Sequence, residues 1–193
     1  MTAITYSGRV ASYIARMATP SRHANATKIV SNSRTFFVTS STHDKRQLLQ
    51  SDRSAGLFVE VLYYYRAQGK FRLHEWVVMP DHFHLLLTVE SGMSIERAVQ
   101  FIKGGFAFRA GKELGTRAPF WQKGFSEVRV LDSQHYAKAR DYIWNNPVER
   151  CLVRTPEEYL YSSARRGFEV DAPPQRLKPV GVVACSDMAK AIS

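Results

Sequence analysis

Cysteine is scarce in this sequence, with two residues in 193, Cys151 and Cys185. Neither forms part of a Cys-x-x-Cys pair, which argues against a disulfide scaffold and against a thiolate zinc site. We interpret both as free thiols in a reducing cytoplasm. No run approaches the roughly 18 apolar residues of a membrane span, so no membrane partner is expected. A Gly-x-x-x-x-Gly-Lys-Ser/Thr phosphate loop is also missing, so no nucleotide cofactor is expected.

Acidic residues are few relative to basic ones. The chain has 27 Lys and Arg against 17 Asp and Glu, a net charge of +10. Such a balance is typical of proteins that bind an anionic partner, and nucleic acid is the leading candidate. Apolar residues make up 45% of the chain, enough for a core, which excludes global disorder.

One domain with two appendages is expected from the length and the composition. Residues 1–33 contain basic residues and no acidic one, and we interpret them as a flexible arm. This arm either touches phosphates or is a solvated tail without function. Residues 34–166 form the expected domain, and residues 167–193, which contain Pro173 and Pro174, form a flexible tail.

Hydrophobic periodicity predicts the element order β-α-β-β-α-β-α. Strands are expected at 35–40, 71–79, 82–89 and 125–130, and helices at a segment ending near Gly69, at 94–114, and at 134–145 before Pro147. The first six elements match the split β-α-β, ferredoxin-like pattern of an α+β fold. Helices then cover one face of an antiparallel sheet, and we expect the other face to be free for a ligand or another chain. Alternation along 71–79 places Leu73, Glu75, Val77 and Met79 on one face.

Two histidines alternate with a phenylalanine in the strand that starts at His82. Side chains in a strand alternate between faces, so His82 and His84 point the same way and Phe83 points the other way. Two adjacent imidazoles can form half of a divalent metal site. They can equally be ordinary strand histidines, and the pair alone does not decide.

Tyr142 and Asn146 lie one helical turn apart, so they share a helix face. A tyrosine can be a covalent nucleophile, and an asparagine can offer its amide oxygen to a metal. Taken singly, Tyr142 also fits a half-buried aromatic residue, and Asn146 fits the end of a helix before Pro147.

Taken together, three segments resemble single-tyrosine transposases of the His-hydrophobic-His (HUH) superfamily, and most closely the bacterial REP-associated tyrosine transposases. The segments are 78–87, 120–125 and 142–148, with further similarity at 156–164. The resemblance implies an HUH nuclease domain over 34–166. It also implies Tyr142 as the nucleophile and His82, His84 and Asn146 as ligands of Mg²⁺ or Mn²⁺. Val128 replaces a histidine that is frequent in the family, and Cys151 stands where glycine is common.

The resemblance implies a DNA strand transferase that nicks single-stranded or hairpin DNA and forms a 5′-phosphotyrosine link. It would act in the bacterial cytoplasm as a monomer or homodimer. Basic residues outnumber acidic ones between 97 and 129, with aromatic residues interleaved, and such groups bind backbone phosphates and stack on bases. The expected DNA contacts are Lys103, Arg109, Trp121, Lys123 and Arg129.

Two other functions remain open at this stage. The first is a non-catalytic DNA- or RNA-binding protein, a domesticated transposase that keeps the fold and the basic face. The second is a metal phosphohydrolase in which water replaces Tyr142, although no cluster of Asp ligands accompanies the histidines. The first predicts salt-dependent binding without cleavage, and the second predicts turnover without a protein–DNA ester.

Overall fold

A four-stranded antiparallel sheet is the central layer of the protein, which is described by a computed structural model for residues 33–174 and residue 177. The strands are β1 (Arg34–Ser41), β2 (Arg72–Met79), β3 (His82–Val89) and β4 (Ser126–Val130). Their order is β2-β3-β1-β4, the arrangement of a split β-α-β unit, so the predicted α+β, ferredoxin-like fold is confirmed. Except for its last residue, the arm predicted over 1–33 lies outside the described residues.

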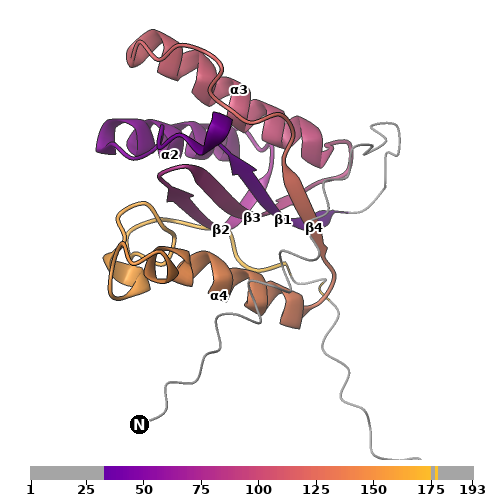
Figure 1. Cartoon of the computed structure of the whole chain (residues 1–193). Coiled ribbons are helices and arrows are strands. Elements are labelled where there is room, and N and C mark those ends of the chain that lie inside the picture. The colour runs from indigo at the N-terminus through magenta and orange to yellow at the C-terminus, as the bar shows by residue number, and fades with distance from the viewer. Residues whose placement is uncertain (1–32, 175–176, 178–193) are drawn as a thin grey trace, which may run out of the picture.

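Two helices cover one face of this sheet (Figure 1). They are α2 (Asp52–Ala67) and α3 (Ile95–Glu113), and the side chains of Ser51 and Ser94 cap their N-termini. Gly105, which would weaken an isolated helix, allows α3 to approach α2 closely. A Cβ atom at this position would lie 2.6 Å from the Tyr65 ring of α2. Within the described residues, no helix has the length and apolar character needed to cross a bilayer.

A third helix, α4 (Ser133–Glu149), covers the opposite face of the sheet (Figure 1). The expectation that this face would be free is therefore wrong. Phe37, Val77 and Leu86 project from it and are almost fully buried against α4. Burial of each of these side chains contributes about 1.5–3 kcal/mol to the free energy of folding, which favours the packing of α4 on this face.

Pro147 lies inside α4, and the prediction that the helix stops before it is wrong. Proline removes one backbone hydrogen bond, to the carbonyl one turn earlier, but here only the last turn is affected. The helix ends in a Schellman arrangement, in which the amides of Cys151 and Leu152 donate to the carbonyls of Val148 and Pro147. Asn146 is consequently a helical residue whose side chain faces the sheet.

The strand β2 carries an irregularity that changes which face its residues occupy. The register with β3 shifts between Leu73 and Glu75. Leu73 packs in the core under α2 and α3, whereas Val77 and Met79 pack against α4. The sequence expectation that these residues share one face fails for Leu73, because an extra residue in a strand reverses the alternation.

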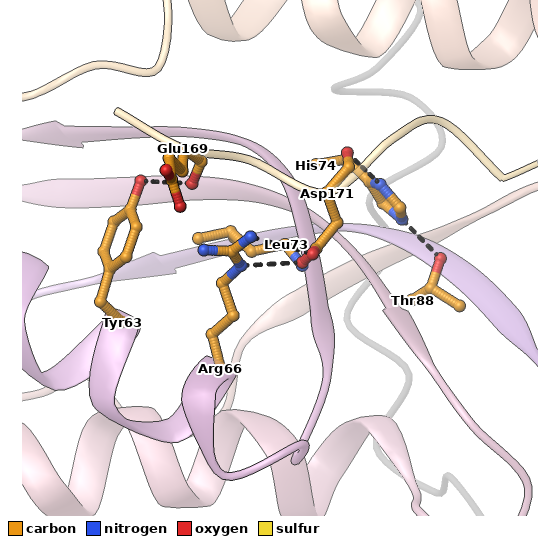
Figure 2. A network of polar contacts seen from close by, with 7 residues as sticks. All are labelled: Tyr63, Arg66, Leu73, His74, Thr88, Glu169 and Asp171. Carbon is orange, nitrogen blue, oxygen red and sulfur yellow. Dashed lines mark hydrogen bonds and ion pairs between the residues drawn. The ribbon is translucent and has the colours of Figure 1, made fainter. Parts of the chain in front are cut away.

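The segment after α4 covers the outer edge of β2. This segment includes the short helix η2 (Pro156–Glu158) and continues to Asp171. Figure 2 shows its end, where the Asp171 carboxylate accepts hydrogen bonds from the Arg66 guanidinium and the Leu73 amide. Further along the edge, the amide of Val78 donates to the carbonyl of Tyr161. Such contacts protect a strand edge from pairing with another chain. The domain limit predicted at residue 166 stays a prediction, although these contacts extend past it.

Candidate functional site

The two histidines of β3 lie on the face of the sheet that α4 covers. His82 pairs with Ser41 of β1 and with Met79 of β2, at the end of the sheet, and His84 lies two pairs further in. Their ring centroids are 4.8 Å apart, and 6% and 4% of each residue is exposed. The intervening Phe83 packs into the core on the other face, as strand alternation predicts.

The helix α4 brings Tyr142 and Asn146 to these histidines. The Tyr142 ring centroid is 5.1 Å from that of His84, and Nδ2 of Asn146 is 3.3 Å from Nε2 of His84. Phe37 of β1 supports both rings, because it stacks on His84 and meets the Tyr142 ring edge-on. The structure therefore brings together the four residues that the sequence singles out, all from one chain.

Each imidazole is also held at its Nδ1 atom. Nδ1 of His82 is 2.5 Å from Oδ1 of Asp81, in the turn between β2 and β3. Nδ1 of His84 is 2.7 Å from Oγ1 of Thr39 on β1. Sequence reasoning did not assign a role to Asp81 or Thr39, since only the strand pairing places Thr39 opposite His84.

Burial sets the charge state of the site. It lowers the pKa of His82, and it holds the pKa of His84 well below its ordinary value, so both imidazoles are neutral at physiological pH. Burial also raises the pKa of Tyr142, and Glu149 adds to this effect, while a hydrogen bond with Asn146 and the charge of Arg150 oppose it. The phenol therefore keeps its proton in the protein alone.

A divalent ion fits this group of side chains. Neutral imidazoles are the form that binds metals, and a buried amide oxygen is an acceptable ligand. Oδ1 of Asn146 is buried and has no hydrogen-bond partner, which is costly unless another group satisfies it. Among the described residues, no group of three or more His, Cys, Asp or Glu could hold a metal ion.

Three of the five predicted DNA contacts are engaged within the protein, on the side of the sheet away from α4. The ammonium group of Lys103 donates to the carbonyls of Gln122 and Gly124, and burial lowers its pKa to about 8. Nε1 of Trp121 donates back to the carbonyl of Lys103, and its ring packs on the core. Arg109 pairs with Glu60 and Glu113.

The other two predicted DNA contacts are exposed. Arg129 lies on the edge strand β4, beside Phe36 of β1. Lys123 lies in the loop before β4, and the preceding residue, Gln122, donates its amide to the carbonyl of Ser41. Ser41 of β1 also pairs with His82 of β3, so one strand separates this loop from His82. All five assignments stay predictions.

Two basic residues near the site were not among the predicted contacts. The charges of Lys45 and Arg150 act on both imidazoles. Lys45 ends the short helix η1 (His43–Lys45), and Arg150 follows the last turn of α4, with its amide donating to the carbonyl of Asn146. The only sequence signal for Arg150 is its place one turn after Asn146, and nothing in the sequence distinguishes Lys45.

Comparisons with known proteins identify the family of the chain. Residues 29–146, a range that contains all four central residues, match the family described as "Transposase IS200 like". The chain is similar to the REP-associated tyrosine transposase of Escherichia coli strain K12, with 28% identity over 97 residues, which cover 50% of this chain and 56% of that protein. The chain thus spans little more than half the length of this curated relative.

The fold is also similar to a solved structure, that of the REP-associated tyrosine transposase bound to a REP hairpin. The TM-score is 0.56 at 24% identity, and the match covers 76% of this chain and 89% of that chain. At this level of identity, the similarity concerns the fold alone.

Proposed function

This chain belongs to the family of IS200-like transposases, and from that premise we propose that it nicks and rejoins single-stranded DNA through a tyrosine. The substrate that we propose is a hairpin-forming repeat, by analogy with the REP hairpin bound by its structural neighbour. The observation that carries the proposal is the contact of Tyr142 with the two-histidine strand, at 5.1 Å between the Tyr142 and His84 rings.

In the proposed reaction the Tyr142 oxygen attacks a DNA phosphorus atom. The bond from phosphorus to the 3′-oxygen breaks, the phenolic proton is lost, and a 5′-phosphotyrosine ester and a free 3′-hydroxyl remain. A second 3′-hydroxyl can attack this ester in the reverse sense and join new ends, so no nucleotide cofactor is consumed. The ester retains the free energy of the phosphodiester bond.

His82, His84 and Asn146 would hold a divalent ion, Mg²⁺ or Mn²⁺. Such an ion supplies positive charge at the scissile phosphate and orients the attacking and leaving oxygens. The three ligands are neutral, so they leave that charge undiminished. Arg150 and the Asn146 side chain lower the pKa of the Tyr142 phenol against the effect of burial, which favours loss of its proton.

The residues of the proposed site all come from one chain. Tyr142, His84 and Asn146 are in contact without a second copy, because α4 packs on the sheet of its own chain. We therefore propose an active site built within one protomer. Both a monomer and a homodimer of independent sites fit this arrangement.

The test is a labelled single-stranded hairpin oligonucleotide incubated with the protein and Mn²⁺. We expect a covalent protein–DNA adduct that Tyr142→Phe abolishes, since phenylalanine lacks the attacking oxygen. Tyr136→Phe is the matched control, because Tyr136 is a buried tyrosine of α4 that packs beside His74 rather than at the site. His82→Ala should remove the dependence of cleavage on Mn²⁺.

The same assay separates the alternative functions. Cleavage by Tyr142→Phe would refute the tyrosine mechanism and favour a water nucleophile. Salt-dependent binding with no adduct in the unaltered protein, over a set of hairpin sequences, would instead indicate a non-catalytic DNA-binding protein.

A further inference from the structure

Both histidines of the site have a hydrogen-bond partner at Nδ1, and the two partners belong to different elements. Asp81 lies in the turn between β2 and β3, and its Oδ1 is 2.5 Å from Nδ1 of His82. Thr39 lies in the middle of β1, directly opposite His84, and its Oγ1 is 2.7 Å from Nδ1 of that ring. A neutral imidazole has one N–H and one lone pair, so whatever bonds to Nδ1 decides what Nε2 can do.

For His82 the partner decides the tautomer. An ionised carboxylate only accepts hydrogen bonds, so Nδ1 of His82 has to carry the proton. Oδ1 of Asp81 lies 2.5 Å from Nδ1 of His82, and a carboxylate oxygen at this distance accepts the Nδ1 proton. The lone pair of His82 is therefore on Nε2.

The position of Asp81 is itself fixed. The backbone amide of Thr42 donates to the Asp81 carbonyl at 2.9 Å. The Thr42 hydroxyl group shares its one proton between the carbonyls of Arg46, at 2.6 Å, and Asp81, at 3.0 Å. These contacts hold the turn against the end of β1. The side chain of Asp81 is 17% exposed and that of His82 is 7% exposed, so water competes little for their bond.

For His84 two contacts agree. Nδ2 of the Asn146 amide, which only donates, lies 3.3 Å from Nε2 of His84, so Nε2 is the acceptor. In the metal-free protein this amide therefore occupies the lone pair that an ion would take. Nδ1 then carries the proton and donates it to the Thr39 hydroxyl. The Phe37 ring, stacked on the His84 ring at 5.4 Å, prevents the imidazole from tilting.

We propose that Asp81 and Thr39 are positioning residues that hold His82 and His84 as Nδ1–H tautomers, with the two Nε2 lone pairs presented as ligands. The inference rests on the proposed metal site, because it assigns the lone pairs to a divalent ion. Partners of this kind orient ligand imidazoles and raise their basicity, and losing one typically weakens metal affinity about 10- to 100-fold.

The first test needs no metal. Long-range ¹H–¹⁵N spectra of the ¹⁵N-labelled, metal-free full chain report the tautomer of each histidine, and His82→Ala and His84→Ala assign the signals. We expect Nδ1–H for both residues. Either ring found as Nε2–H would overturn the inference for that ring, even in a protein that binds Mn²⁺.

The second test measures Mn²⁺ affinity by titration calorimetry. We expect Asp81→Asn and Thr39→Val each to weaken binding about 10- to 100-fold, with an unchanged far-ultraviolet circular dichroism spectrum. Asp44→Asn is the control for Asp81, because Asp44 pairs with His43 outside the site. Thr35→Val is the control for Thr39, because Thr35 bonds Thr88 on the same face of the sheet.

The outcomes separate the inference from the function. Controls and variants that bind Mn²⁺ equally well would overturn the inference and leave the metal site intact. An unaltered protein that binds no Mn²⁺ but has both Nδ1–H tautomers, lost in the variants, would overturn the metal site and support the positioning role.

Discussion

At the scale of the residue, the proposed site combines neutral imidazoles with a neutral phenol. Burial lowers the pKa values of His82 and His84, and burial raises the pKa of Tyr142. The same burial therefore keeps the imidazoles neutral, the form that binds a cation, and keeps the phenol protonated in the protein alone. Lys45 and Arg150 place positive charge near both imidazoles, where the proposed reaction would develop negative charge on the DNA phosphate.

Cys151 illustrates how one residue limits the stability of α4. It follows the helix in a left-handed conformation, with a φ of 56°, where glycine is favoured. A residue with a β-carbon is disfavoured there by roughly 1–2 kcal/mol, and part of the advantage of glycine is offset by its extra unfolded-state entropy.

We expect Cys151→Gly to raise the free energy of unfolding by roughly 1 kcal/mol, measured by urea denaturation. The thiol is exposed and free, so little packing is lost. Cys151→Ala is the control, because alanine keeps the β-carbon and should give no gain. A gain of equal size in both variants would mean that the thiol, and not the backbone conformation, limits stability.

At the scale of the element, α4 is joined to the sheet by a buried carboxyl group. Oε2 of Glu75 on β2 accepts hydrogen bonds from Nε1 of Trp144 and from the hydroxyl group of Ser163, each at 2.8 Å. Trp144 lies on α4, two residues after Tyr142, and Ser163 belongs to the segment that covers the edge of β2. Glu75 thus connects three elements, which are β2, the tyrosine helix α4 and the segment that covers the edge of β2.

The pKa of Glu75 predicts how stability varies with pH. Burial raises this pKa above its ordinary value of 4.5, so the folded state favours the protonated form. The contribution of Glu75 to stability is fully present below pH 4.5 and is lost as the pH rises through the folded pKa. The size of the loss depends on how far the pKa of the folded state lies above that of the unfolded state.

We expect Glu75→Gln to match the unaltered protein in stability at about pH 4 and to exceed it increasingly towards pH 8, because glutamine stays neutral. The measurement is urea denaturation across this range. Comparing the two proteins cancels the opposite trend of His74, whose pKa burial lowers. Trp144→Phe should steepen the loss at high pH, since it removes a donor to the carboxylate. A constant difference between Glu75→Gln and the unaltered protein would contradict this account.

At the scale of the whole molecule, the basic residues behind the net charge of +10 differ in whether a carboxylate neutralises them. On the α2 and α3 side, Arg109 is paired with two carboxylates. Near the histidines, Lys45 belongs to η1, Arg150 follows α4, and Lys123 lies in the loop before β4. We therefore propose that the DNA backbone enters at this end of the molecule.

We expect Lys45→Ala and Arg150→Ala each to weaken hairpin binding similarly for different sequences. Each should reduce the slope of log affinity against log salt by about one, because each removes one phosphate contact. Fluorescence anisotropy at several salt concentrations measures the slope. Arg72→Ala is the control, since Arg72 pairs with Glu90 at the far end of β2. Equal slopes in all three variants would exclude this entry point.

The sequence by itself determined the fold class and the four central residues. Period-two alternation is a local property of the backbone, so it placed His82 and His84 on one face and Phe83 on the other before any packing was known. Helical spacing likewise put Tyr142 and Asn146 on one side of α4. The order of the elements fixed the strand order, since few connections satisfy it.

Tertiary structure decided the rest, because it depends on contacts between residues distant in the chain. Only packing shows that α4 covers the face of the sheet opposite α2 and α3, and that Pro147 continues the helix. Only packing shows that the register shift in β2 turns Leu73 to the core under α2 and α3. Only strand pairing brings Thr39 to His84. Charge counts identified Lys103 and Arg109, but the free energy of a charge depends on its neighbours, and these two lie among partners that the sequence does not reveal.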